Sequence, residues 1–126
     1  MSKKINFKPK NAIDWDNFYM SMAKLVSLRS KDPGTQVGAC IVNQRNELIS
    51  IGYNGFPRGC REEDLTWNKG KHLDSKYLYV CHAEFNAIIN APYRNELNNC
   101  RIYVTLFPCN ECAKAIIQTG INEIIY

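Results

Sequence analysis

Apolar side chains recur at intervals of three and four residues early in the chain, which is the periodicity of an amphipathic helix. The pattern begins after Asp14, a favourable N-cap residue, and the sequence Asp32-Pro33-Gly34 predicts that the helix ends near Ser30. We expect the apolar stripe to pack against the core of the domain. Its members are Trp15, Phe18, Tyr19, Met22, Leu25, Val26 and Leu28.

Two apolar runs after this helix predict a β-hairpin. Residues 37–42 are almost continuously apolar, and residues 48–53 are apolar again after a polar turn. Asn54-Gly55 then interrupts the second strand, and residues 55–80 have no clear periodicity. A loop of this length inside a compact domain is usually functional or mobile.

Helix and strand signals alternate in the remainder of the chain. Helices are predicted at 82–90 and 109–119, the second of them closed by Gly120, and strands at 101–105 and from residue 121 onward. This order predicts parallel strands with right-handed crossovers and helices that cover the sheet. The expected fold class is therefore α/β, a three-layer α/β/α sandwich whose mixed central sheet includes the N-terminal hairpin.

Composition restricts the class of protein. The 126 residues are 45% hydrophobic and 22% charged, which fits one globular domain over residues 1–126. Within this range, the basic and polar residues 1–12 are expected to form a flexible N-terminal arm. No run approaches the roughly 18 apolar residues of a membrane span, and the N-terminus lacks the apolar core of a signal peptide. We therefore expect a cytoplasmic protein. The net charge of +4 suits an anionic small molecule or a nucleic acid and does not separate them.

Two short motifs have the spacing of a zinc-dependent base deaminase site. His82-Ala83-Glu84 is a His-x-Glu element, and Pro108 begins a Pro-Cys-x-x-Cys element. His82, Cys109 and Cys112 would supply three ligands to Zn²⁺ and leave the fourth position for water. Glu84 would be the acid/base beside that water. Both segments open predicted helices at the carboxyl edge of the sheet, so the ligands can converge.

A structural zinc site or an unrelated cysteine pair is the alternative interpretation of the Cys-x-x-Cys spacing. A structural site would need a fourth protein ligand, for which Cys81 and His72 are the nearby candidates. Glu84 argues against this interpretation, because a structural zinc needs no acid/base. The other cysteines lack ligand spacing and are expected to be buried: Cys40, Cys60 and Cys100.

These residues predict hydrolytic deamination of an aminopyrimidine or aminopurine. Zinc would lower the pKa of a bound water, so that hydroxide can attack the carbon that carries the exocyclic amine. Glu84 would transfer the water proton to the ring nitrogen and then protonate the leaving ammonia. Backbone groups near Ala83 and Pro108 would orient the amine.

Four longer stretches make the chain similar to the deoxycytidylate (dCMP) deaminases of the cytidine deaminase superfamily. They are RSKDPGTQVGACIVN (29–43), IGYNGFPRGC (51–60), YVCHAEFNAI (79–88) and LFPCNECAKAIIQTGI (106–121). The first two narrow the expected substrate to dCMP. The resemblance implies conversion of dCMP to dUMP for thymidylate synthesis, with zinc on His82, Cys109 and Cys112 and with Glu84 as proton shuttle.

The same resemblance implies residues that bind the substrate. Asn54 would contact the substrate sugar, and a simple turn asparagine is the alternative. Arg29, Ser30 and Lys31 are candidates for the 5′-phosphate, and a solvated helix terminus is the alternative for them.

Regulation and assembly also follow from the resemblance. Such enzymes are typically activated by dCTP and inhibited by dTTP, with Mg²⁺, and form homohexamers. Gly55 and Arg58 mark the turn where an effector site is expected. Family members continue beyond the strand near Ile121, so the resemblance implies a chain shortened at its C-terminus.

Two other functions are compatible with the motif. One is a non-catalytic zinc-binding interaction module, against which Glu84 argues. The other is deamination of a base within a nucleic acid, which would need a basic and aromatic groove. Its candidate residues are Lys69, Lys71 and Lys76 with Trp67 and Tyr77, among which Glu62, Glu63, Asp64 and Asp74 are interleaved. Because a loop of mixed charge is usually a solvated surface, nucleic acid is not the expected partner.

Overall fold

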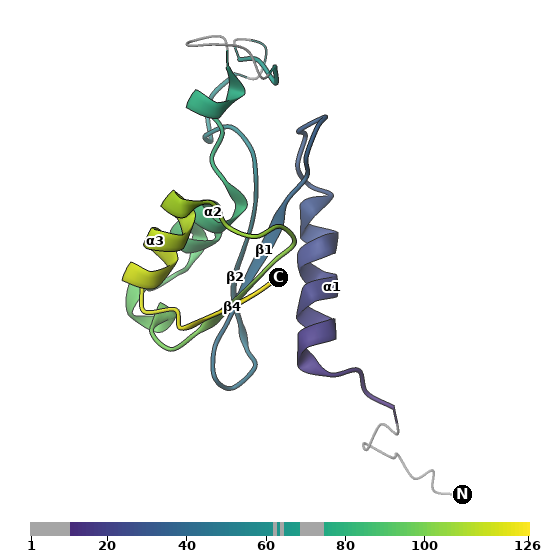
Figure 1. Ribbon diagram of the computed structural model, residues 1–126, viewed down its shortest axis with the longest axis vertical. Helices are drawn as coiled ribbons and strands as arrows, with labels where there is room; N and C mark the ends of the chain where they lie inside the picture. Colours follow the sequence, from purple (N-terminus) through teal and green to yellow (C-terminus); the bar gives the residue numbers. More distant parts are fainter. Residues whose placement is uncertain (1–10, 62, 64, 69–74) are drawn as a thin grey trace, which may run out of the picture.

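The computed structural model describes residues 11–61, 63, 65–68 and 75–126 (Figure 1). The predicted helices and strands are all present, in the predicted order. They are α1 (Trp15–Ser27), β1 (Gly38–Val42), β2 (Leu48–Tyr53), α2 (Ala83–Asn90), β3 (Arg101–Val104), α3 (Asn110–Gln118) and β4 (Glu123–Ile125), with short 3₁₀ helices η3 (Lys76–Leu78) and η4 (Arg94–Leu97). Most of the predicted arm at 1–12 lies outside the described residues.

The four strands form one mixed sheet in the order β2-β1-β3-β4. Strand β1 pairs antiparallel with both β2 and β3, and β3 pairs parallel with β4. The hairpin and the mixed sheet are therefore confirmed. Strands β2, β3 and β4 run in one direction, as predicted, but β1 lies between β2 and β3. Only β3 and β4 are parallel neighbours.

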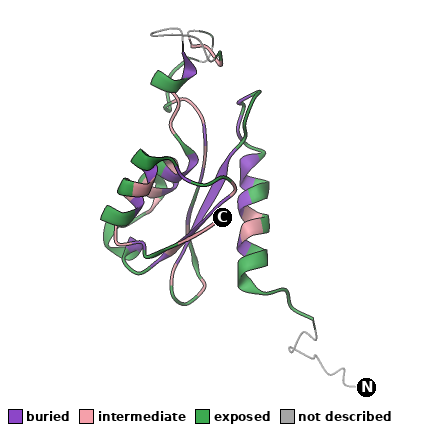
Figure 2. Cartoon of the chain, viewed as in Figure 1, coloured by how far each residue is buried: buried purple, intermediate pink, exposed green. Residues whose placement is uncertain are grey.

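Alternation along the central strand β1 creates the three layers. Ala39 and Ile41 belong to the cluster beneath α2 and α3, whereas Cys40 and Val42 belong to the cluster beneath α1. Figures 1 and 2 show α1 alone on one side of the sheet and α2 with α3 on the other. The three-layer α/β/α prediction is confirmed. Within the described residues, none of the helices combines the length and apolarity that a bilayer crossing requires.

Helix α1 begins as predicted and ends earlier. The Asp14 side chain accepts the backbone N–H of Asn17 at 2.8 Å, and the last helical residue is Ser27 rather than Ser30. The expectation that the whole stripe is core is wrong. Four of its members are exposed: Trp15, Phe18, Leu25 and Leu28.

The close approach of α1 to β1 explains this difference. A Cβ atom at Gly38 would lie 2.0 Å from the carbonyl oxygen of Ala23, so the two backbones are nearly in contact. Ala23 is fully buried at this point, between the buried side chains of Tyr19 and Val26. Only the narrow face centred on Ala23 meets the sheet, and the margins of the apolar stripe stay outside.

A similar close approach sets the position of α2, the helix that carries Glu84. A Cβ atom at Gly52 in β2 would lie 2.3 Å from both the Ala83 carbonyl oxygen and the Ala87 nitrogen. We expect Gly52→Ala to destabilise the fold by about 3 kcal/mol or more, because backbone atoms cannot move aside as side chains do. Urea unfolding measures this. Gly55→Ala is the control, since its Cβ would meet nothing within 4 Å, and equal effects of the two substitutions would contradict the prediction.

Candidate active site

The three candidate zinc ligands lie together at the N-termini of α2 and α3. His82 and Cys109 are the residues that precede these helices, and Cys112 lies in the first turn of α3. The His82 Nδ1 atom is 3.5 Å from the Cys109 Sγ atom and 3.3 Å from the Cys112 Sγ atom, and all three donor atoms lie within 4.8 Å of one another. Donor atoms bound to one Zn²⁺ at about 2.0–2.3 Å have separations of this order, so the group fits zinc.

Local structure prepares these side chains for a cation. The His82 side chain makes no capping hydrogen bond, so the imidazole is available as a ligand. Burial, followed by the adjacent Glu84 carboxyl, raises the pKa of the Cys112 thiol. A divalent cation deprotonates a thiol that coordinates it. The donor set of two cysteines and one histidine therefore suits a thiophilic divalent ion such as zinc.

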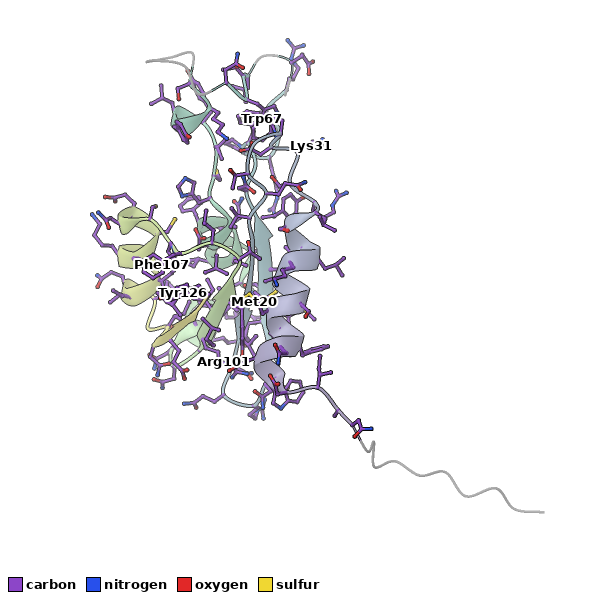
Figure 3. The ribbon with its side chains drawn as sticks, turned by 45° about the vertical axis from the view of Figure 1, so that its right-hand side comes forward. Met20, Lys31, Trp67, Arg101, Phe107 and Tyr126 are labelled. Atoms are coloured by element: carbon purple, nitrogen blue, oxygen red, sulfur yellow. The ribbon has the colours of Figure 1, made fainter. Side chains whose placement is uncertain are left out.

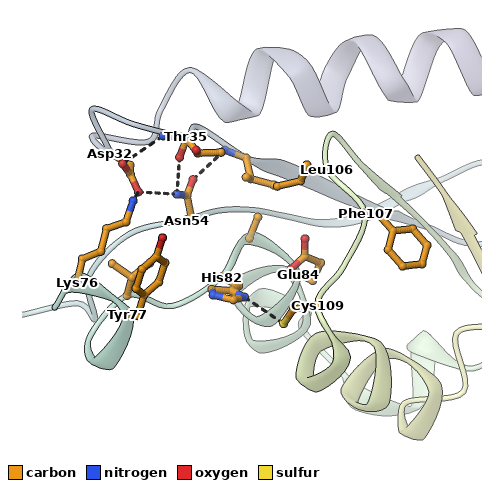
Figure 4. A pocket seen from close by; sticks show the side chains of 13 residues that line it. Asp32, Thr35, Asn54, Lys76, Tyr77, His82, Glu84, Leu106, Phe107 and Cys109 are labelled. Atoms are coloured by element: carbon orange, nitrogen blue, oxygen red, sulfur yellow. Dashed lines mark hydrogen bonds and ion pairs between the residues drawn. The ribbon is translucent and has the colours of Figure 1, made fainter. Parts of the chain in front are cut away.

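A cavity of about 250 Å³ opens beside the ligands (Figure 4). We call one part of its wall the metal side, formed by His82, Glu84 and Cys109, and another the polar side, formed by Asp32, Thr35, Asn54 and Lys76. Apolar side chains complete the wall, including Val37, Val80, Leu106 and Phe107. An apolar wall with a few convergent polar groups is typical of a small-molecule site.

Glu84 lies in the first turn of α2 and lines the cavity, although the residue is only 4% exposed. Its carboxyl is close enough to the Cys112 thiol to shift the pKa of that group. Ala83 also lines the cavity, whereas Pro108 is buried and is not among the described residues that line it. The acid/base candidate therefore lies in the wall of the cavity, next to the ligands, and is itself largely shielded from bulk water.

A buried hydrogen-bond network forms the polar side. The Lys76 Nζ atom lies 2.6 Å from Asp32 Oδ2, and both side chains are at most 5% exposed. Asp32 Oδ1 accepts the backbone N–H groups of Gly34 at 2.8 Å and Thr35 at 3.3 Å. Burial by itself would raise the pKa of Asp32, but the hydrogen bonds from Lys76 and from these backbone groups outweigh it and hold the pKa below its usual value.

Asn54 is part of the same network. Its Oδ1 atom accepts the backbone N–H of Val37 at 2.9 Å. Its Nδ2 atom donates to the carbonyl oxygen of Thr35 at 2.9 Å and to Asp32 Oδ2 at 3.4 Å. Asn54 is buried and lines the cavity, so it is a fixed part of the wall rather than an exposed turn residue.

The sequence interpretation missed the role of Asp32 and Lys76. In the sequence, Asp32 stands out only as part of a helix stop, and Lys76 only as a candidate nucleic-acid contact in a loop of mixed charge. The available signal was the Asp-x-Gly spacing of residues 32–34, which is typical of a side chain that binds its own backbone two residues on. No local pattern could pair residues 44 positions apart.

The three candidate phosphate-binding residues lie outside the cavity wall as the structure describes it. Arg29 is exposed, with its guanidinium 5.9 Å from the centre of the Tyr53 ring. Ser30 is buried, and its Oγ atom accepts the backbone N–H of Asp32 at 3.3 Å. Lys31 is exposed and lies beyond the end of α1 (Figure 3). All three residues nevertheless immediately precede Asp32 in the sequence, and Asp32 is part of the wall.

The candidate effector residues line a second, smaller hollow. Gly55 and Arg58 lie in its wall together with Asn86 and Asn90 of α2. The guanidinium of Arg58 donates a hydrogen bond to the side-chain oxygen of Asn90. The hollow is separate from the metal side, because its described lining shares no residue with that of the larger cavity.

The predictions for the remaining cysteines are confirmed in part. Cys40 and Cys100 are buried, as expected, but Cys60 is exposed in the turn after Pro57, so that expectation is wrong. Cys81 does not belong to the ligand cluster. His72 lies outside the described residues.

The structure describes only part of the candidate nucleic-acid loop. Lys69, Lys71 and Asp74 lie outside the described residues, as do Glu62 and Asp64. Lys76 is committed to its buried ion pair with Asp32. The Trp67 ring packs against the Phe56 ring at a tilt of 34°, with their centres 4.2 Å apart.

Comparison with known sequences identifies the relatives of this chain. Residues 13–126 match the family described as the cytidine and deoxycytidylate deaminase zinc-binding region. The chain is 51% identical to the deoxycytidylate deaminase of Homo sapiens over 121 residues, covering 94% of this chain and 67% of the human protein. It is 49% identical to the probable deoxycytidylate deaminase of Drosophila melanogaster over 126 residues, covering 94% and 62%. The chain thus spans about two thirds of the length of these relatives.

Solved structures agree with the sequence comparison. The dCMP deaminase of cyanophage S-TIM5 in its apo form is similar with a TM-score of 0.71 and 27% identity, covering 86% of this chain and 79% of that chain. Its complex with dCMP and dUMP has a TM-score of 0.69 and 26% identity, covering 94% and 82%. The cavity described above thus occurs in a fold that holds a pyrimidine nucleotide in the phage protein.

Proposed function

The chain belongs to the cytidine and deoxycytidylate deaminase zinc-binding family, and we propose that it hydrolyses dCMP to dUMP and ammonia. One observation carries the proposal. A buried glutamate, Glu84, lines a cavity of about 250 Å³ directly beside the zinc-ligand group of His82, Cys109 and Cys112. The cellular role that follows is supply of dUMP for pyrimidine nucleotide synthesis.

Zinc held by His82, Cys109 and Cys112 supplies Lewis acidity, which makes a water nucleophilic near neutral pH. Glu84 carries out the proton transfers. Its carboxylate takes the proton of the attacking water and delivers it to ring nitrogen N3 as the C4–O bond forms. The carboxylate then takes the second water proton and passes it to the amine, so that the C4–N bond breaks and neutral ammonia leaves.

The cavity wall would hold the substrate around this chemistry. Backbone groups near Ala83 and Pro108 orient the exocyclic amine, and Asn54 contacts the sugar. The segment of Arg29, Ser30 and Lys31 binds the 5′-phosphate, which its position next to the polar side supports. Exclusion of water by the apolar walls strengthens the hydrogen bonds to all these groups.

Two alternatives receive less support. Deamination of a base within a nucleic acid would need free basic groups around the cavity, and Lys76 is instead neutralised by Asp32. A non-catalytic zinc module would have no use for a buried carboxylate, whose burial costs stability. Glu84 therefore favours an enzyme over an interaction module.

Regulation, assembly and location extend the proposal. We assign dCTP as activator and dTTP as inhibitor, with Mg²⁺, to the hollow that Gly55 and Arg58 line. The homohexamer is taken from the family resemblance, and the exposed apolar side chains of α1, which another subunit would cover, support an oligomer. None of the six cysteines forms a disulfide, which suits a reducing cytoplasm.

A panel of substrates tests the reaction and its specificity. We expect the protein with bound zinc to reduce cytosine absorbance with dCMP, and to do so far more slowly with deoxycytidine, CMP or a cytosine-containing oligonucleotide. Each reaction is run with and without dCTP and Mg²⁺. Turnover of the oligonucleotide in place of dCMP would overturn the proposal and favour the nucleic-acid alternative. Loss of the activity at higher salt would then be steep.

A further inference from the structure

The amide of Asn54 has little hydrogen-bonding capacity left. A side-chain amide has two N–H donors and an oxygen with two lone pairs. Both donors of Asn54 are used, one by the Thr35 carbonyl at 2.9 Å and one by Asp32 Oδ2 at 3.4 Å. The Val37 N–H occupies one lone pair of the oxygen at 2.9 Å. One lone pair on Oδ1 remains, so toward a ligand Asn54 can act only as an acceptor (Figure 4).

Two backbone groups identify the oxygen and nitrogen of this amide. A backbone N–H can only donate and a carbonyl oxygen can only accept. If the Asn54 amide were reversed, its NH₂ group would face the Val37 N–H. Its oxygen would face both the Thr35 carbonyl and the Asp32 carboxylate. Each of these contacts would be repulsive, so the geometry determines one orientation.

Asp32 holds this arrangement in two ways. Its Oδ2 atom receives the Asn54 amide directly. Its Oδ1 atom binds the N–H groups of Gly34 and Thr35, which fixes the segment that presents the Thr35 carbonyl and the Val37 N–H to Asn54. Lys76 balances the buried charge of Asp32 at 2.6 Å. Asp32 itself needs no contact with the ligand for this role.

We propose that Asp32 is a positioning residue that locks the Asn54 amide as an acceptor-only group, so that the cavity selects a ligand with a hydroxyl donor. The inference rests on the proposed function for the identity of the ligand. When the 5′ position of a 2′-deoxynucleotide carries phosphate, the 3′-hydroxyl is the one sugar hydroxyl left. The locked amide therefore reads the hydrogen of the 3′-hydroxyl.

Substrate analogues test this on the unaltered zinc-loaded protein. The 3′-fluoro analogue of dCMP can accept but not donate, whereas the 3′-amino analogue can donate. We expect kcat/KM to fall about tenfold to a hundredfold for the fluoro analogue, because the buried oxygen then loses its partner. The amino analogue should stay within about fivefold of dCMP. A fluoro analogue as good as dCMP would overturn the inference while leaving dCMP deamination intact, and no turnover of dCMP itself would refute the proposed function instead.

The variant Asp32→Asn tests the positioning role. An asparagine at position 32 has no negative charge to attract Lys76. If its NH₂ group takes the place of Oδ2, it also faces the NH₂ group of Asn54 and repels it, so the lock is released. We expect the ratio of kcat/KM for dCMP to that for its 3′-fluoro analogue to fall toward one. A purely structural role would lower both values equally and leave the ratio unchanged, which would overturn the proposal.

Ser50→Ala is the matched control for Asp32→Asn. It removes another buried hydrogen bond, from the Ser50 hydroxyl to the Ala87 carbonyl at 2.6 Å, but Ser50 does not line the cavity. The fluoro discrimination should therefore persist in this variant even if its stability falls. The analogue series on the unaltered protein does not depend on how well either variant folds.

Discussion

Glu84→Gln is expected to lower kcat for dCMP by about 10³-fold or more while zinc stays bound. Glutamine keeps the size and burial of the side chain, but its amide cannot take a proton from water and return it to N3 and the leaving amine. General acid–base catalysis contributes about 10²–10⁴-fold, and this residue would serve two successive transfers. Loss of cytosine absorbance measures the rate, and elemental analysis of the same sample measures the zinc content.

Glu111→Gln is the matched control, because it makes the same change of charge between the two cysteine ligands. Glu111 lies on the exposed face of α3 in an ion pair with Lys114 at 2.7 Å. Exposed pairs of this kind contribute about 0–1 kcal/mol to stability, so we expect activity close to that of the unaltered protein. Similar activity in the two variants would show that Glu84 is not the proton carrier. Loss of zinc from Glu84→Gln would show that the residue acts through the metal site.

The start of α1 and the end of α3 could be predicted because their determinants are local. Asp14 caps α1 through a residue three positions away, and Gly120 closes α3 with a positive φ of 90°. The almost continuous apolar run of residues 37–42 likewise predicted the strand β1. Which strand lies next to β1 depends on pairing between distant segments, and the element order alone did not reveal that β1 separates β2 from β3.

The amphipathic pattern of α1 also had a limit that the structure explains. A stripe of apolar positions predicts that a surface will be covered but not what covers it. Within this chain only the narrow face around Ala23 meets the sheet, because Gly38 lets the two backbones approach closely. Trp15, Leu25 and Leu28 remain exposed. The width of the contact between α1 and the sheet depends on tertiary packing, so the periodicity of the helix cannot predict it.

The metal side and the polar side of the candidate site also differ in how far the sequence could predict them. The metal side could be predicted because its chemistry lies in two short motifs, each at a helix start. The polar side joins Asp32, Asn54 and Lys76 from three separate segments. In sequence each of these residues resembles an ordinary turn or surface residue, and only their mutual contacts make burial of the charges favourable.

Cys112→Ala is expected to remove zinc from the protein and with it all deamination. Cys112 is the buried member of the ligand group, 3.3 Å from His82 Nδ1. Its loss would leave two protein ligands, which do not hold Zn²⁺ in a catalytic site that normally has three. Changing residues that merely support ligands weakens metal binding about 10–100-fold, so loss of a ligand should exceed a hundredfold. Competition with a chromogenic chelator measures the affinity.

Cys100→Ala separates metal loss from the general cost of deleting a buried thiol. Cys100 is 1% exposed, its Sγ atom donates to the Glu96 carbonyl at 2.9 Å, and it does not belong to the ligand group. We expect this variant to lose some stability and to keep one zinc per chain with near-normal turnover. If Cys112→Ala retained zinc as tightly as Cys100→Ala, the ligand assignment would be wrong. If instead both variants lost zinc, the metal affinity would depend on the packing of the whole layer beneath α2 and α3, because Cys100 belongs to that core cluster.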